Sequence, residues 1–317
     1  MARLIDADDI DFSAYERENA PRMKVRPAAL FADQLEAAFA PREHGARRPR
    51  MSSTKMRHCI EFRPGETTVW AGYNGHRKSL VTGQTMIDLC AQGERVMAMS
   101  LEMLPGMTLA RQCRQAFGTA TPSARQREAF MRWTDDRLWL FDHLGHFAPK
   151  LCLAALRYFA DKVGGHHAFI DSMMMVCESE ESMDEQKALV TNLVRIAQET
   201  GLHIHLVAHC RKPGDDESKP PTKYQIRGSA AISDQVHNIV TVWANKAKKA
   251  EIEAKGAKAS EDTLAKPDAL LSVEKQRNGA FEGKLGLWFD EASFRFTDER
   301  TTPIEPFPIE DDLDFAA

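Results

Sequence analysis

The stretch Thr67–Leu80, TTVWAGYNGHRKSL, decides how the rest of the chain is organised. A β-branched and aromatic run reaches Gly72, a glycine-containing turn follows, and Lys78 and Ser79 open an apolar segment of helical character. Strand, glycine turn, Lys-Ser and helix together predict the phosphate-binding arrangement of a P-loop. In this arrangement, backbone N–H groups and the positive end of the helix dipole face a bound anion.

The side chains of this turn have separate expected tasks. Lys78 would reach the outer phosphates of a nucleotide, and the Ser79 hydroxyl would hold Mg²⁺. ATP and Mg²⁺ are therefore the expected ligands. The predicted nucleotide-binding residues are Gly72, Asn74, Gly75, His76, Arg77, Lys78, Ser79 and Leu80.

Arg77 departs from the usual P-loop, in which a glycine precedes the lysine. A right-handed helical backbone at this position would tolerate a side chain, and then only Gly72 and Gly75 would need special backbone freedom. The guanidinium would project outward or add a phosphate contact, or it would weaken nucleotide binding. For this stretch alone, a chance glycine-lysine turn stays open as the alternative.

The composition is ordinary for a globular protein, with 43% hydrophobic and 28% charged residues among 317. A net charge of −4 is too small to indicate a partner. The 6 cysteines are scattered and form no C-x-x-C pair, which favours reduced thiols over a disulfide frame or a zinc site. The chain has no apolar run of membrane-spanning length, and we expect no membrane contact.

Charge is unevenly placed along the chain. Residues 1–57 read as a polar leader that contains an amphipathic helix at 27–40 and a basic linker. The apolar stripe of that helix would pack on its own domain or on a neighbouring subunit. Residues 299–317 read as an acidic, disordered tail with Phe307 and Phe315.

Strand-like and helix-like segments alternate from about residue 58. Predicted strands are 67–71, 95–100, 137–142, 167–171, 203–208, 238–243, 270–274 and 285–289. Predicted helices are 78–91, 106–117, 122–133, 149–162 and 183–200, and residues 246–268 are expected to form a helical hairpin inserted at the surface. The alternation predicts an α/β fold with a mainly parallel, helix-flanked sheet that binds ligands at the carboxyl ends of its strands.

Three polar residues stand at predicted strand ends. Glu102 follows a strand expected beside the P-loop strand, where a carboxylate can polarise a water molecule. Asp171 closes an apolar strand, as expected of a Walker B acid in the Mg²⁺ shell, and His209 ends the next strand. Taken one at a time, a surface acid and a core histidine are the alternatives.

The order of the chain's segments resembles the RecA-like motor domain of the DnaB-type hexameric replicative helicases. These segments are GYNGHRKS, SLEM, FIDS, VAHCRKP, IRGSAAISDQVHNIV, EKQRNG and LWFD. The resemblance covers roughly residues 58–297, and it implies a RecA-like ATPase domain over residues 58–298. The segment of His209 followed by Arg-Lys-Pro is most similar to Twinkle and the T-odd phage helicase-primases.

The resemblance implies roles for matching positions. Lys78 and Ser79 resemble the phosphate and Mg²⁺ ligands, and Glu102 the catalytic base. Asp171 resembles the metal-binding Walker B acid, and His209 the residue that senses the γ-phosphate. Lys275 and Arg277 resemble a pair donated to the neighbouring subunit's ATP, for which a solvated strand end is the alternative.

The resemblance also implies partners and a location. Residues 173–182 and 211–229 would be loops that touch single-stranded DNA in a hexameric ring, and acids of the second loop would partly face away. The predicted DNA contacts are Arg211, Lys212, Lys219, Lys223 and Arg227. The tail would recruit a primase, a polymerase or a single-strand-binding protein, or would serve solubility alone. The expected compartment is the cytoplasm of a bacterial cell or a phage-infected host.

The sequence thus predicts an ATP-driven, ring-forming replicative DNA helicase or translocase. A RecA-like ATPase that binds DNA for recombination or loading without unwinding is one alternative. A nucleotide-binding scaffold or regulatory module is a second alternative, and Arg77 is the best argument for it.

Overall fold

A ten-stranded sheet forms the centre of the computed structural model, which describes residues 4–5, 28–39, 49–177, 182–211, 216–228 and 230–309. The strand order is β1-β4-β3-β5-β6-β2-β7-β8-β9-β10, with parallel pairing from β1 to β7 and antiparallel pairing from β7 to β10. The strands are β1 (Leu4–Ile5), β2 (Thr67–Gly72), β3 (Val96–Ser100), β4 (Leu138–Phe141), β5 (His167–Asp171), β6 (His203–His209), β7 (Asn238–Ala244), β8 (Ala269–Gln276), β9 (Gly283–Asp290) and β10 (Arg295–Thr297).

The expected α/β fold is confirmed, and each predicted strand is present within a few residues of its expected bounds. The sequence pattern missed β1 and β10, which are two and three residues long. Strands this short carry too few alternating residues to give a periodic signal. The chain order also misled in one respect: β3 does not lie beside the P-loop strand β2, because β5 and β6 come between them.

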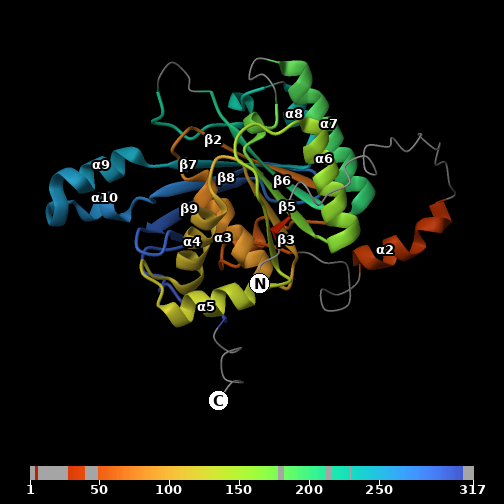
Figure 1. The fold of residues 1–317 in the computed structure, drawn as a ribbon. Helices are drawn as coiled ribbons and strands as arrows, with labels where there is room; N and C mark the ends of the chain where they lie inside the picture. The colour runs from red at the N-terminus through yellow and green to blue at the C-terminus, as the bar shows by residue number, and fades with distance from the viewer. Residues whose placement is uncertain are drawn as a thin grey trace.

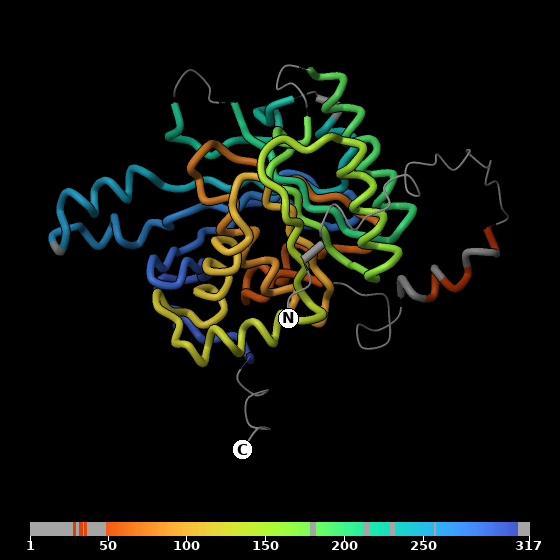
Figure 2. Tube along the Cα trace, viewed as in Figure 1, coloured from red at the N-terminus to blue at the C-terminus, as the bar shows by residue number. Residues whose placement is uncertain are grey.

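Helices cover both faces of the sheet (Figure 1). The α-helices are α2 (Ala32–Phe39), α3 (Lys78–Ala91), α4 (Pro105–Phe117), α5 (Ala124–Trp133), α6 (Pro149–Tyr158), α7 (Met183–Thr200), α8 (Ala230–Gln235), α9 (Lys246–Lys255) and α10 (Glu261–Ala265). A π-helical turn, Phe159–Val163, continues α6. Helices α9 and α10 project from one side of the sheet as a hairpin, where the charged insertion was expected (Figures 1 and 2).

Alternating side chains of the parallel strands feed separate cores on the two faces. In β2, Val69 and Trp70 are both fully buried, Val69 in the cluster under α6 and α7 and Trp70 in the cluster under α3, α4 and α5. A strand buried on both faces reads as a continuous apolar run, which is why these segments were recognisable in the sequence. Packing of these two cores against both faces holds the strands in place, and it thereby fixes the positions of their carboxyl ends.

A network of buried histidines lies at the amino ends of β5 and β6. The Trp70 Nε1–H donates to His205 Nδ1 at 3.2 Å, and His205 Nε2 is 3.2 Å from His167 Nδ1. Because His205 Nδ1 accepts, its proton is on Nε2 and points at His167. The His205 ring also stacks on Phe169, with 3.9 Å between ring centroids. Burial lowers the pKa of His203 and of His205 well below the usual histidine value, so both stay uncharged.

The segment 299–309 differs from the expected disordered tail. The Phe307 side chain is buried under the Arg295 guanidinium, and the Phe307 N–H donates to the Ala116 carbonyl of α4 at 2.8 Å. Ile309 is also buried. The rest of the predicted tail, including Phe315, lies outside the described residues, as does most of the leader. Phe307 is therefore part of the fold.

Candidate nucleotide site

The carboxyl ends of β3, β5, β6 and β2 meet at one edge of the sheet, as the alternation predicts. Glu102 comes just after β3, and Asp171 and His209 are the last residues of β5 and β6. Their side chains and the P-loop line a cavity of about 440 Å³. Arg111 of α4 and Phe294 complete its wall. Strands β5 and β6 thus bring together residues that lie far apart in the sequence.

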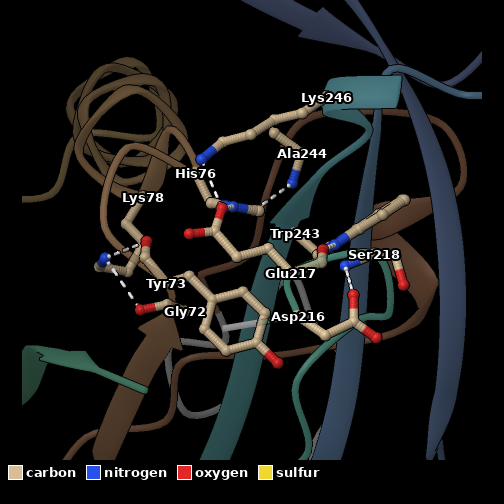
Figure 3. Close-up of polar contacts among 10 residues, drawn as sticks. All are labelled: Gly72, Tyr73, His76, Lys78, Asp216, Glu217, Ser218, Trp243, Ala244 and Lys246. Atoms are coloured by element: carbon tan, nitrogen blue, oxygen red, sulfur yellow. Dashed lines mark hydrogen bonds and ion pairs between the residues drawn. The ribbon is translucent and has the colours of Figure 1, made fainter. Parts of the chain in front are cut away.

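The Lys78 ammonium lies inside the turn that would cradle phosphates. Its Nζ donates to the carbonyl oxygens of Gly72 and Tyr73 at 3.1 and 3.0 Å (Figure 3). It also lies 3.2 Å from His209 Nδ1. Burial lowers the pKa of Lys78, and the carboxylates of Asp171 and Glu102 oppose that shift. A buried cation held by carbonyl dipoles is poised to exchange these contacts for the oxygens of a phosphate.

The Ser79 hydroxyl and the Asp171 carboxylate lie side by side, with 2.6 Å between Oγ and Oδ2. Burial raises the pKa of Asp171, although the Ser79 hydrogen bond lowers it. A hydroxyl and a carboxylate are the hard oxygen donors that Mg²⁺ prefers, and the ion usually keeps several waters and binds through few protein groups. This donor pair therefore fits the expected Mg²⁺ position. Among the described residues, there is no group of three or more His, Cys, Asp or Glu that would form a separate metal cage.

Glu102 extends from the bend after β3, and its side chain is exposed to the cavity. Its Oε1 accepts a hydrogen bond from Ser172 Oγ at 2.7 Å, so the residue after Asp171 orients it. An exposed carboxylate fixed by one hydroxyl retains acceptor capacity for a water molecule. The arrangement can therefore hold a water beside a bound phosphate.

The backbone of Arg77 is left-handed, with φ +66°, which corrects the expectation of a right-handed helical conformation. The glycine usual at this position is explained by that conformation, which side chains adopt at a cost. The Arg77 guanidinium lies 3.8 Å from the centroid of the Phe289 ring of β9. Gly75 also has positive φ, +74°, whereas Gly72 is required for space: a Cβ there would lie 2.4 Å from the Val242 carbonyl oxygen.

A second, larger cavity of about 630 Å³ adjoins the P-loop at Gly75 and Arg77. Its other walls come from the α9–α10 hairpin and from Trp288 and Phe289 of β9. The sequence pattern did not indicate these aromatic side chains as part of the site, because they follow the P-loop by more than two hundred residues. Apolar and cationic groups here can accommodate the rest of a nucleotide beyond its phosphates.

Lys275 and Arg277 lie far from the nucleotide cavity of their own subunit. Residue Lys275 is opposite Ile239 near the start of β7, whereas the P-loop follows the end of the parallel neighbour β2. Lys275 Nζ donates to the carbonyl oxygens of Ser233 and Asp234 at 2.7 and 3.1 Å, and Arg277 Nη2 donates to the latter at 3.0 Å. Both cations thus cap the carboxyl end of α8.

The loop predicted to bind DNA lies against the nucleotide site. Its described part begins at Arg211, whose N–H donates to the Gln225 carbonyl at 2.7 Å, and the Arg227 N–H donates to the His209 carbonyl at 2.7 Å. Lys219 is exposed, and Lys223 is half-buried against β8. Lys212 and residues 178–181 of the other predicted loop lie outside the described residues.

Tyr224 of this loop was not recognised in the sequence. Its side chain is 86% exposed, and the Lys223 Nζ lies 5.6 Å from the centroid of its ring. Gln225 holds the short turn in place, since its Nε2 donates to the Tyr73 hydroxyl at 3.3 Å.

None of the helices in the described parts of the chain combines the length and the apolar character that a membrane span requires.

Comparison with known proteins agrees with this geometry. A family model described as an AAA domain matches residues 52–215. One similar solved structure is described as a DnaB-like replicative helicase and its interactions with primase. It superimposes with a TM-score of 0.69 at 14% sequence identity, and the match covers 87% of this chain and 68% of the helicase chain. A second solved structure, described as an ATPase domain, matches with a TM-score of 0.62 at 15% identity over 75% of this chain and 86% of its own.

The matched region contains the P-loop, Glu102, Asp171 and His209. The structural likeness includes the parallel sheet whose carboxyl edge carries these residues. This chain is therefore a P-loop ATPase that belongs to the AAA domain family and has the RecA-like fold of DnaB-type helicases.

Proposed function

We propose that this protein is a ring-forming motor that hydrolyses ATP to move along single-stranded DNA and to unwind duplexes during replication. The observation that carries the proposal is the contact between the two predicted sites: the backbone of the 216–228 loop is hydrogen-bonded to His209, whose ring touches Lys78. A change at the outermost phosphate thereby reaches the loop proposed to bind DNA. We expect the hexameric ring to act in the cytoplasm.

The chemistry follows from the residues that line the smaller cavity. Lys78 and the P-loop N–H groups would hold the phosphates. Ser79 and Asp171 would hold Mg²⁺, which when bound would supply positive charge to the phosphoryl group being transferred. Glu102 orients a water in line with that group and takes its proton. His209 hydrogen-bonds the outermost phosphate and registers its loss.

Lys275 and Arg277 would complete the site of the neighbouring subunit. They lie near the amino end of β7, whereas their own P-loop follows the carboxyl end of the parallel strand β2. The two therefore stand at opposite ends of the strands, and these cations cannot reach the ATP bound in their own subunit while the sheet is intact. Cations supplied across an interface stabilise the charge of phosphoryl transfer and raise its rate by about 10³–10⁵. Efficient turnover then requires assembly.

The DNA interface is proposed for the loop that contains Arg211, Lys219, Lys223 and Arg227, and for residues 173–182. Cationic side chains neutralise the phosphate backbone without regard to sequence. The exposed Tyr224 ring adds a surface on which a base can stack, and such stacking is worth about 1–3 kcal/mol per base. Substituting Lys223 or Arg227 by alanine should make the salt dependence of DNA binding shallower.

The test combines ATP turnover with strand displacement on a forked duplex. We expect single-stranded DNA to stimulate turnover and ATP to drive displacement of the complementary strand. ATP turnover on DNA without displacement would favour the recombination or loading ATPase. A protein that never hydrolyses ATP in the presence of single-stranded DNA would instead be a nucleotide-binding scaffold, for which the stacked Arg77 is the supporting feature.

Glu102→Gln tests the proposed base. The amide cannot accept the proton of the attacking water, so we expect turnover to fall by about 10²–10⁴-fold. ATP affinity should stay near that of the parent, because the proposed task of Glu102, which is hydrogen-bonded to Ser172, is to hold the attacking water and not the phosphates. Turnover assays and fluorescent-nucleotide titration measure the two quantities. A variant that hydrolyses ATP at the parental rate would remove Glu102 from the mechanism.

A recruiting role for the acidic tail is proposed for residues 310–317 alone, because Phe307 is buried. Candidate partners are a primase, a polymerase or a single-strand-binding protein. Removing residues 310–317 should leave ATP turnover intact and weaken binding to such a partner, which a pull-down with purified proteins measures.

The helix at 27–40 is proposed to pack against a neighbouring subunit, because its apolar Leu35 side chain is 58% exposed.

A further inference from the structure

One acid of the predicted DNA loop is turned toward the P-loop. The Glu217 carboxylate accepts from His76 Nε2 at 2.8 Å and from Lys246 Nζ of α9 at 2.5 Å through the same oxygen (Figure 3). The Trp243 Nε1–H donates to the Glu217 backbone carbonyl at 2.8 Å. Glu217 is therefore held by the P-loop, by β7 and by the α9–α10 hairpin.

His76 has a single proton arrangement that satisfies its contacts. The Ala244 N–H donates to His76 Nδ1 at 3.0 Å, so Nδ1 must be the acceptor and the ring proton must be on Nε2. The Nε2–H then donates to Glu217. The His76 side chain is fully buried, and burial lowers its pKa, so the ring is neutral and its orientation is fixed.

The two ends of the 216–228 loop reach the nucleotide site by different routes. Its carboxyl end is bonded to His209, and the Gln225 amide reaches the Tyr73 hydroxyl. Its amino end reaches His76, next to Arg77 and Lys78, through Glu217. Movement of this end would pull directly on the backbone that cradles the phosphates.

We propose that His76 and Glu217 are positioning residues that couple the 216–228 loop to the P-loop. The proposal rests on the function proposed above and assigns to Glu217 a role opposite to that of the basic residues around it. An acidic side chain that faces DNA repels its phosphates. The Glu217 carboxylate is instead bonded to His76 and Lys246 of its own subunit. When DNA draws the loop inward, the Glu217–His76 bond moves the P-loop, and nucleotide binding acts on the loop by the same amount.

Asp216 provides a matched control beside Glu217. Its carboxylate accepts from the Ser218 N–H at 2.8 Å within the loop itself, and the residue is exposed (Figure 3). Asp216→Ala and Glu217→Ala each remove one negative charge from the same loop. Glu217→Ala alone removes the bond to His76. Glu217→Gln retains an acceptor for His76 but loses the ion pair with Lys246.

The experiment measures kcat and KM for ATP with and without a single-stranded oligonucleotide, and oligonucleotide affinity by fluorescence anisotropy. For Glu217→Ala we expect most of the DNA stimulation of kcat to be lost, because the bond that links the amino end of the loop to the P-loop is removed. Its DNA affinity should not weaken, Asp216→Ala should behave like the parent, and Glu217→Gln should fall between. Urea unfolding checks that each variant is folded.

A second measurement needs no DNA. Hydrogen exchange of residues 216–219, at the amino end of the loop, is followed with and without ADP, and we expect ADP to change it in the parent but not in Glu217→Ala. Parental DNA stimulation in Glu217→Ala, or loop exchange that ignores ADP in the parent, would overturn the coupling. A parent whose loop responds to ADP but whose turnover ignores DNA would instead refute the proposed motor function and leave the coupling intact.

Discussion

At the scale of single residues, Arg77 illustrates two opposing effects at one position. Its left-handed backbone costs about 1–2 kcal/mol relative to glycine, the residue that a P-loop usually has there. Its guanidinium stacks on Phe289, which is worth about 0.5–2 kcal/mol depending on desolvation. The two terms are of similar size, so the chain tolerates an arginine where the motif has glycine.

Arg77→Gly should therefore change the free energy of unfolding by less than about 1 kcal/mol, because relief of the backbone offsets loss of the stack. Urea denaturation measures this change. The matched variant is Gly75→Ala, at φ +74° with open space around the added methyl group, which should destabilise by about 1–2 kcal/mol through the backbone alone. A loss above about 3 kcal/mol for Arg77→Gly would mean that the stack dominates.

At the scale of elements, the histidines of β5 and β6 make the sheet sensitive to acid. Burial keeps the folded-state pKa of His203 and His205 well below the unfolded value near 6.5, so the unfolded chain binds more protons as pH falls. Stability is therefore full above that value and is lost below it. The free energy of unfolding should fall by about 3 kcal/mol between pH 7.5 and 5.5 from these two groups.

Urea denaturation at the two pH values measures this loss. His205→Gln supplies the control, because glutamine can accept from Trp70 and donate to His167 without titrating. The pH-dependent part of the stability should shrink by about half in this variant. An unchanged dependence would show that other groups cause it.

The segment 303–309 offers a second element-scale prediction. Phe307→Ala should lower the free energy of unfolding by about 3–5 kcal/mol, since it empties a buried site beneath Arg295. Thermal or urea unfolding measures the loss. Leu144→Ala removes an exposed apolar side chain and serves as the control. Parental stability in Phe307→Ala would restore the expectation of a free tail.

Local sequence signals predicted the elements but not their long-range contacts. The strands were readable because β2, β5 and β6 are buried on both faces and give continuous apolar runs. The order β3-β5-β6-β2 was not readable, because the chain order does not state which strands pair. The Glu217–His76 bond, which spans 141 residues, leaves no periodic trace in the sequence.

The candidate site was predictable to the same extent. Lys78, Ser79, Glu102, Asp171 and His209 follow strands, and parallel topology brings such residues to one edge. The glycine usual at this position was a signal from which the left-handed backbone of Arg77 could have been predicted, whereas its contact with Phe289 from the other half of the chain could not. Phe307 was misjudged because its acidic neighbours suggested solvent.

At the scale of the whole molecule, shared active sites predict complementation between inactive subunits. Arg277→Ala and Lys78→Ala subunits should each hydrolyse ATP slowly on DNA, the first for want of a cation supplied to a neighbour, the second for want of phosphate binding. Mixing them should restore part of the turnover, because some interfaces pair an intact P-loop with an intact Arg277. Turnover measured against mixing ratio tests this.

Lys255→Ala, which replaces an exposed lysine of the solvated hairpin, is the control and should keep parental turnover by itself. Mass photometry with an ATP analogue and single-stranded DNA reports the subunit number in the same samples. A strict monomer with full turnover, or Arg277→Ala with parental turnover, would refute the shared site.

The hold of Lys275 and Arg277 on the carboxyl end of α8 has a consequence for subunits outside an assembly. If these side chains bind the ATP of an adjacent subunit, each must first break its hydrogen bonds to the backbone carbonyls at the end of α8 in its own subunit. On the proposed shared site, a solitary subunit would keep Lys275 and Arg277 bound to α8, and its ATP hydrolysis would stay slow until subunits assemble.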